Sequence, residues 1–151
     1  MSDEVRIRRL TIADVDTARR TFALMSEAFE TPAEPLSDAY LQRVLASADF
    51  FAFAALAGDE PLGGLTAHVL AMTRAEVREI FLYDLAVHER ARRRGVARAL
   101  VRALLGEARS IGIDEVFVPA DADDPPALAF YRALGAEESA VRFFSFAARR
   151  A

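Results

Sequence analysis

The sequence predicts an α/β (α+β) fold, with a mixed, mostly antiparallel sheet and helices on both faces, in one domain over residues 1–151. Three apolar runs with the composition of strands follow one another between residues 50 and 87. A segment with helical spacing of its apolar residues, 96–111, separates the last of these runs from another strand candidate. Because a helical crossover returns the chain in the same direction, the strands on either side of it should form a parallel pair.

The expected order of elements is β-α-α-β-β-β-α-β-α-β. It rests on alternation in strands, on apolar residues three or four apart in helices, and on glycine or proline between segments. Two helices follow capping residues, which are Thr11, with Asp14 three positions later, and Ser37. Two other helices end at Gly112 and Gly135. The expected ranges are 5–10, 12–29, 38–46, 50–56, 62–72, 77–87, 96–111, 115–120, 127–134 and 141–146.

The charge pattern narrows the class of partner. All nineteen basic residues are arginines, and the net charge is −4. Proteins that bind nucleic acid are usually basic overall, so we expect no nucleic-acid partner. Residues 1–80 carry 8 Arg and 13 Asp or Glu, whereas residues 81–151 carry 11 and 10. The acidic first half suits a cationic small molecule.

Cysteine and histidine usage excludes several kinds of site. The chain has no cysteine, which excludes disulfides, thiolate metal sites and a cysteine nucleophile. Its two histidines, His68 and His88, stand apart in the sequence, so we expect no metal. No apolar run reaches the roughly 18 residues of a membrane helix, so no membrane partner is expected. The N-terminus MSDEVRIRRL lacks the apolar stretch of a signal peptide, and we expect a cytoplasmic protein.

The segment Arg92-Arg93-Arg94-Gly95-Val96-Ala97 lies between the strongest strand candidate and a helix. A helix N-terminus leaves backbone N–H groups without helical partners and carries partial positive charge, so it can bind a pyrophosphate. Glycine lets the main chain approach such a ligand, and the arginines add charge. The alternative is a solvated basic turn that only begins a helix. The segment matches neither Walker A nor GxGxxG, which argues against nucleoside triphosphates and dinucleotides.

In this context the turn resembles the R/Q-x-x-G-x-G/A motif of the GCN5-related N-acetyltransferase (GNAT) superfamily. Residues 127–135, ALAFYRALG, resemble the F-Y-x-x-L-G helix of the same family. The resemblance covers roughly residues 78–146, about half of the chain. It implies the GNAT fold with a splayed pair of parallel strands, acetyl-CoA as cosubstrate, and a glycine turn that holds the CoA pyrophosphate.

Two shorter segments narrow the resemblance. Residues 79–87 (EIFLYDLAV) and 120–131 (ADADDPPALAFY) are similar to the aminoglycoside 3-N-acetyltransferases, which have a Y-D-L-A-V strand end and an acidic D-D-P-A turn. This implies an enzyme that acetylates an amino group of an aminoglycoside, the 3-amino group, and so inactivates the antibiotic. The alternatives are a polyamine or another small amine as acceptor, and a non-catalytic CoA-binding module. The resemblance also allows a homodimer.

Acetyl transfer to an amine needs a base, because an alkylammonium ion at pH 7 is not nucleophilic. Asp84 stands in an apolar strand candidate, where an unpaired acid is costly to bury, so we expect it to be this base and to bind the acceptor. The alternative is a structural carboxylate. Strict alternation places Glu79 on the opposite face, but a β-bulge, which the resemblance to the family implies for this strand, would bring both acids to one face. Glu79 is then a candidate for substrate binding or a second base, or else a surface residue.

The resemblance implies further roles. Tyr131 would protonate the departing thiolate, a task that suits a phenol; the alternative is a core aromatic beside Phe130. A backbone N–H at Leu85 or Ala86 would face the oxyanion, and Leu85 and Val87 would offer backbone groups to the pantetheine amides. The implied cofactor-binding positions are Leu85, Ala86, Val87, Arg92, Arg93, Arg94, Gly95, Val96, Ala97 and Ala129.

Acidic residues outside the strands are candidates for acceptor binding. Asp124 stands seven residues before Tyr131, where many family members have an asparagine that bonds CoA. An aspartate accepts hydrogen bonds only and repels phosphate, so a contact with a cationic acceptor is the alternative to one with CoA. The other acids would form a trough for ammonium groups, unless each is a solvated surface residue; they are Glu27, Glu30, Glu34, Asp121 and Asp123. Three aromatic residues are assigned to core packing: Tyr83, Phe50 and Phe51.

Overall fold

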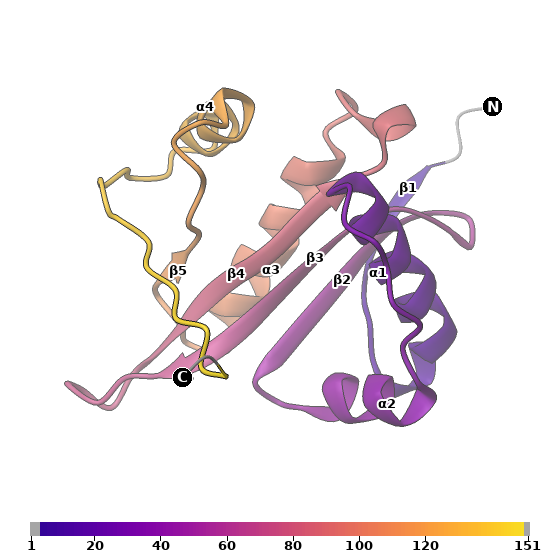
Figure 1. Ribbon diagram of the computed structural model, residues 1–151, viewed down its shortest axis with the longest axis horizontal. Helices are drawn as coiled ribbons and strands as arrows, with labels where there is room; N and C mark the ends of the chain where they lie inside the picture. The colour runs from indigo at the N-terminus through magenta and orange to yellow at the C-terminus, as the bar shows by residue number, and fades with distance from the viewer. Residues whose placement is uncertain (1–3, 150–151) are drawn as a thin grey trace. The chain divides into compact units, whose positions relative to one another are not determined.

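A computed structural model describes residues 4–149 as two compact units that meet in sequence between Val118 and Pro119. The first unit holds a five-stranded sheet, three helices and two 3₁₀ turns (Figure 1). Its elements are β1 (Val5–Arg9), a 3₁₀ turn (Ile12–Asp14), α1 (Val15–Ala28), α2 (Asp38–Ala46), β2 (Phe50–Ala57), β3 (Glu60–Ala71), β4 (Arg78–Val87), a second 3₁₀ turn (Glu89–Ala91), α3 (Val96–Ser110) and β5 (Val116–Phe117). The second unit holds α4 (Pro125–Ala133).

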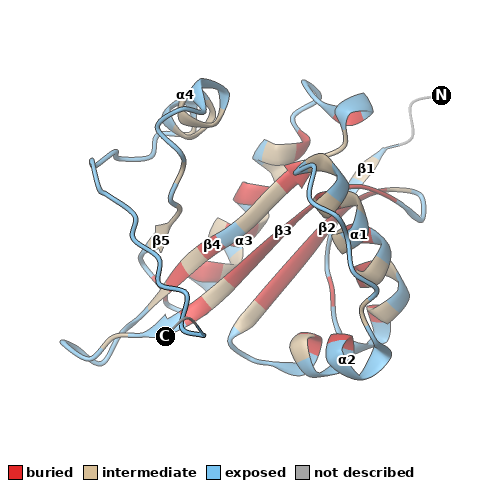
Figure 2. Cartoon of the chain, in the orientation of Figure 1, coloured by how far each residue is buried: buried red, intermediate tan, exposed pale blue. Residues whose placement is uncertain are grey.

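The sheet has the order β1-β2-β3-β4-β5, which confirms the predicted fold class. The first four strands pair antiparallel, and β5 pairs parallel to β4 after the crossover through α3. Helices α1 and α2 lie on one face of the sheet and α3 lies on the other (Figure 1). The buried positions concentrate in the central strands, where both faces are covered (Figure 2).

Strand β2 supplies side chains to both layers of the core because successive residues point to opposite faces. Ala52, Ala54 and Leu56 join a buried cluster with Leu41 and Leu45 of α2. On the other face Phe51 is buried, and the Arg9 guanidinium lies 4.3 Å from the centroid of its ring. Arg9 also pairs with Glu107 of α3 at 2.7 Å, which fixes α3 to the first strand.

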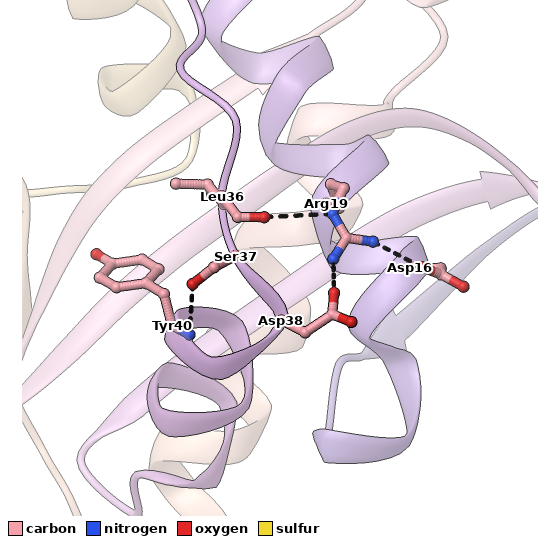
Figure 3. A network of polar contacts seen from close by, with 6 residues as sticks. All are labelled: Asp16, Arg19, Leu36, Ser37, Asp38 and Tyr40. Carbon is pink, nitrogen blue, oxygen red and sulfur yellow. Dashed lines mark hydrogen bonds and ion pairs between the residues drawn. The ribbon is translucent and has the colours of Figure 1, made fainter.

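The expected helix caps are present. Thr11 and Asp14 form the predicted capping box, but it opens the 3₁₀ turn that precedes α1. The hydroxyl of Ser37 accepts a hydrogen bond from the Tyr40 N–H at 3.1 Å and so caps α2 (Figure 3). None of the helices in the described part of the chain has the length and hydrophobicity needed to span a bilayer.

Arg19 of α1 connects both helices on this face of the sheet. Its guanidinium pairs with Asp16 at 2.6 Å and with Asp38 at the start of α2 (Figure 3). Its Nε donates to the carbonyl oxygen of Leu36 at 3.4 Å. One side chain therefore joins α1, the connecting loop and the first turn of α2.

Three elements differ from those predicted from the sequence: one strand is shorter, one helix begins earlier and one strand is absent from the described residues. The strand expected at 115–120 is reduced to β5, since it includes Pro119, which has no N–H to donate to a ladder. Helix α4 begins two residues early, because prolines are tolerated in the first turn of a helix. The strand expected at 141–146 does not form. Residues 141–147 lack regular structure, and Phe146 is 95% exposed. A strand needs a partner for its backbone groups, which an apolar sequence alone does not supply.

Gly64 of β3 lies in close contact with helix α1. A Cβ at this position would lie 2.6 Å from both the Met25 sulfur and the Thr21 methyl group, and both residues are buried. Gly64 therefore sets the distance between α1 and the sheet.

We predict that Gly64→Ala lowers the free energy of unfolding by about 1–3 kcal/mol, the usual cost of overpacking. Gly106→Ala is the matched control. A Cβ at Gly106 of α3 meets nothing within 4 Å, and alanine there should stabilise the helix by about 0.5–1 kcal/mol. Urea unfolding of both variants measures the difference. Equal stability of the two variants would contradict the packing described for Gly64.

Candidate active site

Strand β4 contains a β-bulge at Tyr83. In its register with β3, Asp84 pairs with Thr66 but Leu82 pairs with Ala67, so Tyr83 is the extra residue. The bulge changes the face to which the following residues point. The side chains of Phe81, Tyr83 and Asp84 all line one cavity. The bulge that the resemblance to the family implied is therefore present between Glu79 and Asp84.

The cavity has a volume of about 790 Å³ and is lined entirely by residues of the first unit, from α1, α2 and strands β2 to β4 and the segments next to them. Most of its lining is apolar or aromatic. The lining contains four acidic or basic side chains. They are the carboxylates of Asp49 and Asp84, the guanidinium of Arg43 and the imidazole of His68. This size suits a small-molecule ligand.

The pKa of the Asp84 carboxyl is raised above its ordinary value. The residue is partly buried, and desolvation raises this pKa, while His68 partly offsets the rise. Loss of water raises the pKa because the charged form loses more hydration than the neutral form. A carboxylate in this setting binds a proton more readily than one in water, as a general base must.

A row of rings runs from β2 across β3 to β4 beside this carboxylate. The centroid distances are 5.2 Å between Phe50 and His68, 5.3 Å between His68 and Tyr83, and 5.4 Å between Tyr83 and Phe81. Phe81 in turn stacks on Phe117 of β5 at 5.1 Å. We call Phe50, His68, Tyr83 and Phe81 the aromatic row; all four line the cavity.

The assignment of aromatic residues to the core was right for Phe51 and wrong for Tyr83. Phe51 is 2% exposed, whereas Tyr83, the extra residue of the bulge, is 58% exposed and lines the cavity. Sequence reasoning also missed His68 as a residue of the site. Thr66 and His68 stand two positions apart in an otherwise apolar strand, and this spacing placed both on one face.

Beyond Phe81, β4 continues without β5. The two strands pair only at Ile80 and Phe81, although β4 extends to Val87. The His88 N–H donates to the Leu62 carbonyl at 2.7 Å, so it points toward β3. Since N–H groups alternate sides along a strand, the N–H of Ala86 also points toward β3, whereas those of Leu85 and Val87 point to the side that β5 leaves. Those two amides are available to a ligand in the opening.

The glycine turn leads from β4 into α3 with two residues in left-handed conformation, Arg93 at φ 63° and Gly95 at φ 76°. Arg92 Nε donates to the Val87 carbonyl at 3.3 Å, which ties the turn back to β4. Gly95 is the N-cap of α3 and provides no side-chain cap, so the first N–H groups of the helix, including those of Val96 and Ala97, remain without helical acceptors. This N-terminus fits an anionic ligand such as a pyrophosphate.

The second unit holds the remaining catalytic candidate. Tyr131 lies on α4 in edge contact with Phe130, at 5.1 Å between centroids. Burial, together with the nearby carboxylate of Asp124, raises the pKa of the Tyr131 phenol. The same Asp124 caps α4 by accepting a hydrogen bond from the Ala127 N–H at 3.2 Å. Asp124 therefore has a structural task that the sequence analysis did not foresee.

The other acidic candidates lie outside the cavity lining. Glu27 and Glu30 are exposed near the end of α1, and Glu79 is partly buried on β4. Asp121 and Asp123 are exposed in the turn before α4, as is Ala129 on that helix. Among residues 4–149 no group of three or more metal-ligating side chains could hold a metal ion.

Comparisons with known proteins place the chain among acetyltransferases. An aminoglycoside acetyltransferase from an uncultured soil metagenomic sample, solved with sisomicin, is 32% identical over 94% of this chain and 95% of its own, with a TM-score of 0.86. A second aminoglycoside acetyltransferase from such a sample is 36% identical over 96% and 99%, with a TM-score of 0.87. The aminoglycoside N-acetyltransferase AAC(6')-Iy, solved with CoA, shares the fold at 20% identity, over 95% of each chain, with a TM-score of 0.80.

Among curated protein sequences, none matches this chain. The family comparison is decisive, because residues 18–136 match the acetyltransferase (GNAT) family over more than half of the chain. This match includes the strand with Asp84, the glycine turn and the helix with Tyr131. The chain therefore belongs to the acetyltransferase (GNAT) family.

Proposed function

We propose that this acetyltransferase transfers the acetyl group of acetyl-CoA to an amino group of an aminoglycoside, the 3-amino group, and thereby inactivates the antibiotic. The observation that carries the proposal is the identity of 32–36% over nearly the whole chain with two aminoglycoside acetyltransferases. The 3-amino position rests on the resemblance of residues 79–87 and 120–131 to the 3-N-acetyltransferases.

GNAT enzymes use acetyl-CoA, which supplies an acetyl thioester when it is bound. The described residues fit this cosubstrate in two places. The N-terminus of α3 at Gly95 would hold the pyrophosphate, with charge added by Arg93 and Arg94, which are exposed in the turn. The amides of Leu85 and Val87, which face the opening beside β4, would hold the pantetheine and the carbonyl oxygen. Between the two amides considered for the oxyanion, the direction of the N–H groups favours Leu85 over Ala86.

Asp84 would take the proton of the acceptor's ammonium group. The acceptor nitrogen needs a free electron pair, and the carboxylate supplies a base of raised pKa inside the cavity. Tyr131 would give a proton to the departing sulfur. A phenol is protonated at neutral pH, and burial raises the pKa of this one further, so the proton is present when it is needed.

Asp84→Asn should lower kcat by about two to four orders of magnitude, the usual contribution of a general base, and should leave the affinity for CoA nearly unchanged. Asp59→Asn, in the exposed turn between β2 and β3, is the control and should keep wild-type kcat. The measurements are thiol release for kcat and calorimetry for CoA. A full rate in Asp84→Asn would remove this residue from the mechanism.

The pH dependence follows from the sign of the Asp84 shift. The base acts only when it is deprotonated, and burial raises its pKa, so the acidic limb of kcat/KM should lie above the ordinary range of an aspartate. This limb should disappear in the residual activity of Asp84→Asn. A limb that stays in place in the variant would assign the titration to another group.

Gly95→Val should weaken CoA binding by about tenfold or more, because a β-branched residue is strained at φ 76° and its side chain would stand between the main chain and the phosphates. Gly58→Val is the matched control: Gly58 has φ 60°, a Cβ there also meets nothing within 4 Å, and the residue lies in the turn between β2 and β3. It should lose comparable stability and keep its CoA affinity. Equal CoA affinity in both variants would contradict the role of the turn.

Thiol release from acetyl-CoA with gentamicin, sisomicin and spermidine tests the acceptor. We expect turnover of the aminoglycosides, with acetylation at the 3-amino group in the NMR spectrum of the product. Turnover of spermidine alone would replace the proposal with polyamine acetylation. Binding of CoA without turnover of any amine would indicate a CoA-binding module.

A further inference from the structure

The cavity has few charged side chains among many apolar ones. Its lining contains Asp49 and Asp84 as carboxylates and Arg43 as a cation. The acids Glu27 and Glu30, which the sequence suggested for ammonium groups, do not belong to this lining. An ammonium group can lie against Asp84 or Asp49, and the rest of the lining is suited to the apolar part of an acceptor.

The walls of the cavity present aromatic surface to solvent. The exposed fractions are 45% for Tyr40, 46% for Phe29 and 58% for Tyr83, which are high values for large side chains that line one cavity. Phe22 and Phe50 line it as well. An apolar group bound here would remove this surface from water, which is a favourable change of roughly 25 cal/mol per Å².

We call the aromatic side chains named above, Phe22, Phe29, Tyr40, Phe50 and Tyr83, the aromatic wall of the cavity. Contacts within the protein position this wall without a ligand. The aromatic row fixes His68 and Tyr83 on the strand side, at 5.2–5.4 Å between neighbouring centroids. On the helix side the Ser37 cap and the pairing of Arg19 with Asp38 position the first turn of α2, which carries Tyr40 (Figure 3). A preformed aromatic surface binds a rigid ring at little cost in conformational entropy.

We propose that the cavity accepts a second class of acetyl acceptor, a monoamine with one aromatic ring on a short alkyl chain, its amino group at Asp84 and its ring on the aromatic wall. This arylalkylamine activity goes beyond the proposed action on aminoglycosides and uses the same base. The amine nitrogen bonds to the acetyl carbonyl carbon, the carbon–sulfur bond of acetyl-CoA breaks, the amine proton leaves through Asp84, and CoA leaves as the thiol. The products are the N-acetyl amine and CoA.

Thiol release with a matched pair of amines tests the proposal. For 2-phenylethylamine against ethylamine, kcat/KM should rise by about tenfold or more, the scale of discrimination by an apolar pocket. Equal values for the two amines would overturn the proposal.

Variants locate the preference in the cavity. Tyr40→Ala should reduce the ratio of kcat/KM for 2-phenylethylamine over ethylamine by several-fold, because it removes a ring from the wall. Ile12→Ala is the control, since it removes a 60% exposed apolar side chain that does not line the cavity. Its ratio should equal that of the wild type. The same ratio in both variants would overturn the assignment.

The outcomes separate this inference from the proposed function. Turnover of gentamicin without a preference for 2-phenylethylamine over ethylamine would overturn the inference alone. The preference for 2-phenylethylamine without turnover of any aminoglycoside would overturn the proposed function alone. Binding of CoA without turnover of any of these amines would overturn both.

Discussion

The β-bulge at Tyr83 is the constraint on which the arrangement of the site depends. One extra residue in β4 brings Asp84 to the face on which Phe81 and Tyr83 lie, so all three line the same cavity. The bulge lies just beyond Ile80 and Phe81, the last residues at which β5 pairs with β4. The strand thus offers a carboxylate to the cavity and, immediately afterwards, main-chain amides to the side that β5 leaves.

The position that the bulge gives Asp84 is partly buried, and this burial raises the pKa of its carboxyl. An acid placed beside aromatic rings loses water, and the resulting rise in its pKa makes it a better base. His68 moderates the effect and also completes the aromatic row between Phe50 and Tyr83. In the proposed mechanism, the same apolar surroundings would serve catalysis and define what kind of acceptor fits.

The two relatives and the cavity lining bear on the acceptor in different ways. The relatives at 32–36% identity are aminoglycoside acetyltransferases. The cavity lining offers the Asp84 carboxylate to an amino group and the rings of Tyr40 and Tyr83 to an apolar group. Because a fold does not by itself fix the acceptor, the two proposed acceptor classes need to share only an amino group that faces Asp84.

The sequence by itself determined the fold class, the capping of α2 by Ser37, the glycine turn at Gly95 and the base candidate Asp84, because these depend on local patterns and a few neighbouring residues. Only the tertiary structure decided the rest. Asp84 lies on the same face as Tyr83 because the pairing with β3 contains a bulge, and His68 joins the site because three strands bring its ring between two others. Residues 141–146 have the composition of a strand but no regular structure, since a strand forms only where another strand satisfies its backbone groups.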